Sequence, residues 1–260
     1  MKILVVADEE SRSLYEYYSK EKLADIDLIL SCGDLSRDYL EFLVTMGHAP
    51  LLYVAGNHDD SFAQKPPTGC IPIDEKIYNF HGLRVGGLSG SVRYKESGAY
   101  QYTEEQQRRR VQRLRRSIER YHGIDIFLTH APARGLGDGS DFPHRGFSCF
   151  YEILDRWQPL YFVHGHQHLN YGEGKRMQRY QGTKIINGYV SYILELDESD
   201  YPSERENTGS LIYDLYNHLR YGKAESPYRN NEPPKANLPS KTNLSPKPSQ
   251  PGHIQRSGGT

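Results

Sequence analysis

Three short apolar runs near the N-terminus, each followed by polar residues, constrain the fold of this chain more than any other feature. Residues 3–7, 26–32 and 50–55 are rich in Ile, Leu and Val, and helix-compatible stretches over residues 11–23 and 38–46 separate them. Strands that alternate with helices at this spacing are typical of βαβ units, which build parallel sheets with both faces covered. The sequence therefore predicts an α/β fold.

The polar residues after these runs are of kinds that bind ligands. Asp8 follows the first run, Gly33-Asp34 the second, and Gly56-Asn57-His58-Asp59 the third. In open α/β sheets, ligands bind in the crevice outside the carboxyl ends of the strands. Asn offers a neutral oxygen, His a nitrogen ligand or a proton donor, and Asp a carboxylate that can orient a histidine. One such motif alone is compatible with a polar turn, whereas three successive strand ends indicate a shared site.

Two later strands end in the same way. Residues 124–128 are followed by His130, and residues 160–163 run into a segment that contains His166 and His168. Asp and His with few cysteines are borderline-to-hard ligands that suit Mn, Fe, Zn or Mg. The set is large enough for two metal ions with a bridging carboxylate, an arrangement suited to in-line displacement at phosphorus.

The region between these strands predicts a hairpin and a long helix. Residues 76–80 and 83–88 flank His81-Gly82, which indicates a β-hairpin and hence a mixed sheet. A Thr-x-x-Gln capping box at residues 103–106 opens an arginine-rich helix that extends to about residue 121. The arginines would suit nucleic acid, or they cover a solvated face opposite inward-facing apolar residues. The net charge of -1 favours the solvated face, so nucleic acid is not the expected partner.

In this order, the motifs resemble the calcineurin-like metallophosphoesterase family. That family's pattern is Asp-x-His, Gly-Asp, Gly-Asn-His-Asp/Glu, a lone His and Gly-His-x-His, and the chain follows it from Asp8 to His168. The resemblance implies a four-layer α/β sandwich of two mixed β-sheets flanked by helices, over residues 1–196. The loop after His130 also resembles that of a small bacterial and animal subgroup linked to cyclic nucleotide hydrolysis.

The resemblance also implies a role for each motif residue. One divalent ion would be held by Asp8, Asp34 and His168. The other would be held by Asp34, Asn57, His130 and His166, with Asp34 as the bridge. A hydroxide between the two ions would attack phosphorus, and His58, oriented by Asp59, would protonate the leaving oxygen. Manganese is the expected metal, with zinc, iron and magnesium as alternatives.

One position departs from the family pattern. Glu10 stands where the first motif has a histidine. We expect its carboxylate to bind metal, which would favour harder ions such as Mn or Mg over Zn. Alternatively, Glu10 faces solvent at the start of the helix predicted from residue 11, where a negative charge suits the helix dipole. The first metal ion would then be held weakly.

Other candidate residues lie in loops. His144 and Arg145, in the long loop after His130, are candidate contacts for a substrate phosphate, or they only tether the loop. Tyr94 and Tyr100 could stack on a base, but ordinary surface tyrosines are the favoured interpretation.

The predicted function is a metal-dependent phosphoesterase acting on a small phosphodiester or nucleotide-like substrate in preference to a monoester. One alternative is a catalytically weakened ligand-binding or scaffold protein on the same fold, in view of Glu10. The other is a nucleic-acid-directed protein that uses the arginine-rich helix. The oligomeric state is left open.

Composition bounds the location and the domain limits. The three cysteines are far apart, without CxxC spacing, which indicates a reducing compartment. No apolar run approaches the ~20 residues of a membrane span, so we expect a cytoplasmic protein without a membrane partner. Residues 197–222 predict a short helical extension, and residues 223–260, rich in Pro, Lys and Ser, a disordered tail.

Overall fold

The computed structural model describes residues 1–96, 98–169 and 174–197. The first of two large sheets has the strand order β13 (Val190–Glu195), β1 (Lys2–Ala7), β2 (Leu28–Ser31), β3 (Leu51–Tyr53) and β4 (Ile71–Pro72). Strands β1 to β4 run parallel, and β13 pairs antiparallel with β1.

The second large sheet has the strand order β11 (Met177–Tyr180), β12 (Thr183–Asn187), β10 (Tyr161–His164), β9 (Ile126–Thr129), β6 (Leu83–Leu88) and β5 (Ile77–Phe80). Its four central strands are parallel, whereas β11 and β5 are antiparallel edge strands. A short parallel pair, β7 (Ser91–Val92) and β8 (Gln101–Tyr102), lies apart from both large sheets. Both large sheets are therefore mixed, as predicted.

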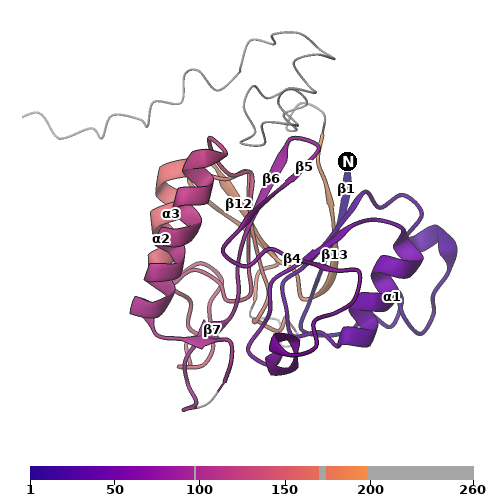
Figure 1. Ribbon diagram of the computed structural model, residues 1–260, viewed down its shortest axis with the longest axis horizontal. Coiled ribbons are helices and arrows are strands. Elements are labelled where there is room, and N and C mark those ends of the chain that lie inside the picture. Colours follow the sequence, from indigo (N-terminus) through magenta and orange to yellow (C-terminus); the bar gives the residue numbers. More distant parts are fainter. Residues whose placement is uncertain (97, 170–173, 198–260) are drawn as a thin grey trace, which may run out of the picture. The chain divides into compact units, whose positions relative to one another are not determined.

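The helices lie on the outer faces of the two sheets (Figure 1). They are α1 (Arg37–Gly47), α2 (Glu104–Arg120) and α3 (Tyr151–Trp157), with the 3-10 helices η1 (Lys20–Lys22), η2 (Asp60–Ala63) and η3 (Ser148–Phe150). Helix α1 packs on the first sheet, and α2 and α3 pack on the second. The layers therefore follow the order helix, sheet, sheet, helix.

Side chains that point alternately to the two faces of each strand hold the layers together. In β1, Ile3 and Val5 point into a core shared with Val85 of the second sheet, whereas Leu4 points to the α1 side. Because successive strand side chains alternate between faces, a continuous apolar run is needed where both faces are covered. The predicted four-layer α/β sandwich is confirmed.

The structure confirms the hairpin and the long helix. Strands β5 and β6 pair from Phe80 opposite Leu83, and the two residues between them have positive φ. At the start of α2, the Thr103 hydroxyl accepts from the Gln106 amide while the Gln106 side chain accepts from the Thr103 amide. Both predictions rest on local signals, which tertiary packing did not override.

The helix predicted over residues 11–23 is wrong. This segment forms turns and the short η1. Leu14 and Leu23 still pack in the core beside α1, and the Lys22 ammonium group donates to the carbonyl oxygens of Ser13 and Tyr17. The turns thus bury the apolar side chains and satisfy backbone groups without a continuous helix, in a segment whose several tyrosines have modest helix propensity.

The domain limits stay predictions. Apart from Asp197, the expected extension over residues 197–222 and the tail over residues 223–260 lie outside the described residues. Within the part of the chain that the structure describes, no helix combines the length and apolar character that crossing a membrane requires.

Candidate metal centre

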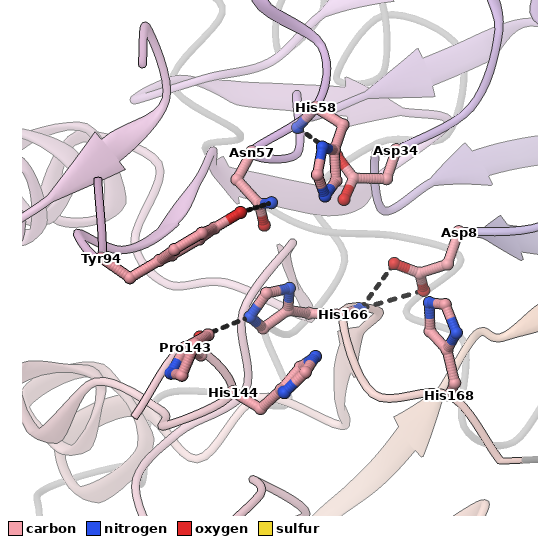
Figure 2. A pocket seen from close by; sticks show the side chains of 9 residues that line it. All are labelled: Asp8, Asp34, Asn57, His58, Tyr94, Pro143, His144, His166 and His168. Atoms are coloured by element: carbon pink, nitrogen blue, oxygen red, sulfur yellow. Dashed lines mark hydrogen bonds between the residues drawn. The ribbon is translucent and has the colours of Figure 1, made fainter. Parts of the chain in front are cut away.

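A cleft of about 470 Å³ lies at the carboxyl ends of the parallel strands (Figure 2). Its lining consists of Asp8, Asp34, Asn57, His58, Tyr94, Pro143, His144, His166 and His168. Strands β1, β2 and β3 of the first sheet and β10 of the second deliver most of these side chains, because the carboxyl ends of these strands lie at the same end of the two packed sheets. His130, directly after β9, is fully buried and in contact with Asn57 and Asp34.

Tight turns bring the motif residues together. Asp8, Asp34 and His166 have φ of 65°, 57° and 66°, in the left-handed region that few non-glycine residues adopt. A Cβ on Gly56 would lie 2.1 Å from Asp34 Oδ1, and one on Gly33 would lie 2.3 Å from the Gly56 amide nitrogen. The turns after β2 and β3 can therefore approach this closely only with glycine at both positions.

Asp34, His130 and His166 form the tightest group of candidate ligands, with one ligand atom from each within 4.8 Å of the others. The His130 Nδ1 donates to the Cys32 carbonyl oxygen at 2.8 Å, and the His166 Nε2 donates to the Pro143 carbonyl oxygen at 2.9 Å. Since a carbonyl oxygen only accepts, each imidazole keeps its other nitrogen for a metal ion. Metal-binding histidines characteristically have this support.

The charges of this group suit a divalent cation. Burial and the nearby His130 lower the pKa of His166, so its imidazole is neutral at pH 7. Burial opposes protonation of His130, but the Asp34 carboxylate, 3.3 Å from Nε2, raises the pKa of His130. Burial would raise the pKa of Asp34, yet His130 and the His58 amide lower it. Burial raises the pKa of Asp8 to about 7. Buried carboxylates and a neutral imidazole are a donor set that a cation stabilises.

Asn57 completes the group on the side of β3. Its Oδ1 lies 3.0 Å from His130 Nε2, and its Nδ2 donates to the Tyr94 hydroxyl at 3.2 Å (Figure 2). The sequence favoured an ordinary surface tyrosine at position 94 over a stacking contact with a base, and it predicted no contact with Asn57. Tyr94 lies 37 positions from Asn57, in a loop without a motif, so no signal in the sequence pointed to the contact.

Asp8 and His168, the other predicted ligands, also line the cleft. Both Asp8 carboxylate oxygens accept from the His166 backbone amide at 2.9 Å, which ties the end of β1 to the turn after β10. The His168 ring stacks on Tyr189, with the centroids 4.9 Å apart. Asp8 and His168 therefore line the same cleft as Asp34, and their binding of a metal ion with Asp34 as the bridge stays a prediction.

Asp59 contacts the backbone of both ligand-bearing turns. Its Oδ2 accepts from the amides of Gly56 at 2.7 Å and Asp34 at 2.9 Å, and burial raises its pKa to about 6. His58 has an exposed side chain at the cleft, and its backbone amide donates to Asp34 Oδ1 at 2.7 Å. The Asp59 contacts are structural, and its expected action on the His58 imidazole stays a prediction.

Glu10 does not join the Asp34 group. Its carboxylate accepts a hydrogen bond from the Ser36 hydroxyl, and Ser36 caps the N-terminus of α1. Glu10 is absent from the described lining of the cleft. Glu10 therefore lies near the start of a helix, as the solvent-facing alternative expected. That helix is α1, however, and not the helix predicted from residue 11. Metal binding by Glu10 stays a prediction.

Only one of the two predicted phosphate contacts reaches the cleft. The His144 ring lies 5.1 Å from the His166 ring, and its Nδ1 pairs with Asp141 Oδ2 at 2.6 Å. The Arg145 guanidinium lies 5.4 Å from the ring centroid of Phe142, outside the described lining. Substrate contacts by His144 and Arg145 both stay predictions, and only His144 lines the cleft.

Comparisons with known proteins agree with this geometry. The model of the family described as calcineurin-like phosphoesterase matches residues 1–170. The crystal structure of TT1561 of Thermus thermophilus shares 16% identity at a TM-score of 0.52, covering 72% of this chain and 88% of that one. Another crystal structure shares 14% identity at a TM-score of 0.54, covering 74% of this chain and 94% of that one. No curated protein matches the chain. At these identities the two structures show the shared fold, and the family match over most of the chain shows that it belongs to the calcineurin-like phosphoesterases.

Proposed function

We propose that the protein binds two divalent metal ions and hydrolyses a small phosphodiester or nucleotide-like substrate. Membership of the family supports a metal-dependent phosphoesterase in general. The observation that carries the proposal is the convergence of polar residues from five strand ends on one cleft. There, the carboxylate of Asp34 lies beside two imidazoles, each of which donates to a carbonyl oxygen through one ring nitrogen and can bind metal through the other.

The residues divide into two ligand sets. One consists of Asp34, Asn57, His130 and His166. The other consists of Asp34, Asp8 and His168. When bound, the ions would activate water for attack on phosphorus and neutralise the phosphoryl oxygens. The mixture of oxygen and nitrogen donors without thiolate fits manganese, with zinc, iron and magnesium as alternatives.

Two histidines are available for proton transfer and substrate contact. His58 presents an exposed imidazole at the cleft while Asp34 holds its backbone amide, so it can donate a proton to the leaving oxygen. His144, whose Nδ1 pairs with Asp141, can in its imidazolium form donate from Nε2 to a phosphoryl oxygen in the cleft.

The lining supports a diester in preference to a monoester. None of the nine described lining residues is Lys or Arg. A phosphodiester carries one negative charge near pH 7, whereas a monoester carries close to two because its second pKa is about 6. Beyond the proposed metal ions, the described lining offers no Lys or Arg to hold the second charge of a monoester, which favours the diester. Its volume of about 470 Å³ is within the usual range of small-molecule sites.

The test uses the full chain, stripped with chelator and reloaded with Mn²⁺, Zn²⁺, Fe²⁺ or Mg²⁺. We expect bis(p-nitrophenyl) phosphate to be hydrolysed with a higher kcat/KM than p-nitrophenyl phosphate. The proposal fails if no metal gives activity above that of the Asn57→Ala variant. Faster monoester hydrolysis would overturn only the substrate preference.

The contact of Glu10 with Ser36 favours the weakened binding protein as a second candidate function. Glu10→His restores the family residue, so metal content of the variant discriminates between the candidates. A large gain in bound metal, together with inactivity of the unmodified chain, supports the binding protein. Unchanged metal content with turnover supports the enzyme.

The arginines of α2 argue against a nucleic-acid surface. Arg109 pairs with Glu105, Arg113 with Glu75, and Arg115 with Glu152. Val111, Leu114 and Ile118 are fully buried against the second sheet. These ion pairs offset the positive charge that phosphate binding would require, so α2 fits a solvated outer helix.

A further inference from the structure

We propose that Tyr94 is a positioning residue, which holds the Asn57 carboxamide with its oxygen directed at the metal-binding group. The inference rests on the proposed function in one respect, because it takes Asn57 as a metal ligand. It adds a residue to the site that no motif contains, from the loop between β7 and β8.

A carboxamide can present either of two ends. Its oxygen binds metal, whereas its amino group is a donor and repels a cation. In the structure, Asn57 Oδ1 lies 3.0 Å from His130 Nε2, and the opposite end, Nδ2, donates to the Tyr94 hydroxyl at 3.2 Å. Figure 2 shows the Tyr94 side chain reaching across the cleft to this amino group. While the Tyr94 oxygen accepts from Nδ2, the carboxamide oxygen stays on the side of the metal-binding group.

An Asn57 carboxamide turned the other way would also make a favourable contact, so the observed orientation needs support. Asp34 Oδ2 lies 3.3 Å from the same His130 nitrogen that faces Asn57 Oδ1. An amino group turned toward this side would approach an ionised carboxylate, which is a strong acceptor. Asn57 is 4% exposed, so little water can satisfy its amino group if the Tyr94 oxygen is removed. Loss of that oxygen leaves the amino group without this acceptor, and a turn toward the Asp34 carboxylate would supply another.

The position of Tyr94 is set independently of Asn57. The backbone amides of Tyr94 and Lys95 both donate to Gln101 Oε1, at 3.2 Å and 3.1 Å. Gln101 is 3% exposed and begins β8, which pairs with β7. The buried amide of Gln101 thus anchors the backbone at Tyr94, so the hydroxyl meets Asn57 at a predetermined place.

The experiment measures Mn²⁺ binding to the chelator-stripped full chain by calorimetry. We expect Tyr94→Phe to weaken binding of one Mn²⁺ about tenfold, the lower end of the range for residues that orient metal ligands, and to leave the other unchanged. Tyr100→Phe is the matched control, because it removes a hydroxyl from the same loop, and it should leave both affinities unchanged. Equal Mn²⁺ binding by Tyr94→Phe and the unmodified protein would overturn the inference.

A second background separates orientation from general support of the loop. In Asn57→Asp, either end of the side chain is an oxygen, so no selection of orientation is needed. Adding Tyr94→Phe to Asn57→Asp should therefore not weaken Mn²⁺ binding further. A loss of the same size in both backgrounds would show that Tyr94 only supports the loop, and the inference would be wrong.

Asn57→Ala distinguishes this inference from the proposed function. If Asn57→Ala binds both Mn²⁺ ions as tightly as the unmodified protein, the ligand set of the proposed function is wrong. If Asn57→Ala weakens one ion while Tyr94→Phe weakens neither, the ligand set stands and only the role of Tyr94 is refuted.

Discussion

Removal of the Asp59 carboxylate should destabilise the protein strongly, because that group joins the two turns that carry the metal ligands. Asp59 Oδ2 accepts from the backbone amides of Gly56 and Asp34, at 2.7 Å and 2.9 Å, and Asp59 is 4% exposed. A buried amide left without an acceptor costs about 1–3 kcal/mol. Asp59→Ala should therefore lower the free energy of unfolding by about 2–6 kcal/mol, a large part of the usual ~5–15 kcal/mol.

Asp59→Asn separates this structural role from the predicted orientation of His58. Asparagine keeps one acceptor oxygen for the two amides, so it should retain most of the stability, with a loss from the weaker neutral hydrogen bonds. If Asp59 acted only on the His58 ring, both variants would lose turnover and neither would lose stability.

Urea unfolding followed by circular dichroism, with chelator present, measures the effect without a contribution from bound metal. The expected order of stability is the unmodified protein, Asp59→Asn, then Asp59→Ala. Asp25→Ala is the control, because the Asp25 side chain is 77% exposed and its surface ion pair with Lys2, at 3.6 Å, is worth less than about 1 kcal/mol. A loss no larger than that of the control in Asp59→Ala would refute the reasoning.

Three further outcomes test other parts of the structure. Arg84→Met should lower the free energy of unfolding in urea by about 3–5 kcal/mol, because it deprives the 2%-exposed Asp125 carboxylate of its guanidinium partner. Changing Asp125 to Leu as well should recover part of that loss. Mn²⁺ at 100 times its Kd should stabilise the folded protein by about 2.7 kcal/mol, seen as a rise in Tm that Asp34→Asn largely abolishes. Burial raises the pKa of Cys70 to about 12, so at pH 8 Cys70 in the folded protein should react with thiol reagents far more slowly than in urea; equal rates would contradict this.

The clustering of the motif residues could be predicted because topology enforces it. Asn57 and His130 are 73 positions apart and follow β3 of the first sheet and β9 of the second, yet the two sheets pack with the carboxyl ends of their parallel strands at the same end. The same reasoning placed Asp8, Asp34 and His166 correctly at the cleft. Their order along the chain, with glycines where backbones approach closely, was sufficient for this.

Predictions about single side chains were less secure, because a motif does not specify what a side chain contacts. Asp59 fits the expected orienter by position, but its carboxylate contacts two backbone amides. Glu10 occupies the place of a ligand, but it contacts the cap of α1. The segment from residue 11 has helix-compatible composition, but its apolar side chains are buried through turns.

The sequence by itself determined the α/β class, the mixed sheets, the capped α2 and the residues that meet at the strand ends, because periodicity, turn residues and motif order are local signals that topology converts into proximity. Only the tertiary structure decided that Tyr94 contacts Asn57 and that Gln101 anchors the backbone at Tyr94. It also decided which ring nitrogen of His130 and of His166 donates to a carbonyl oxygen. These contacts join loop segments, and no periodic pattern in the sequence predicts which loop residues meet. Such contacts arise from the packing of the two sheets, and residue types alone do not encode them.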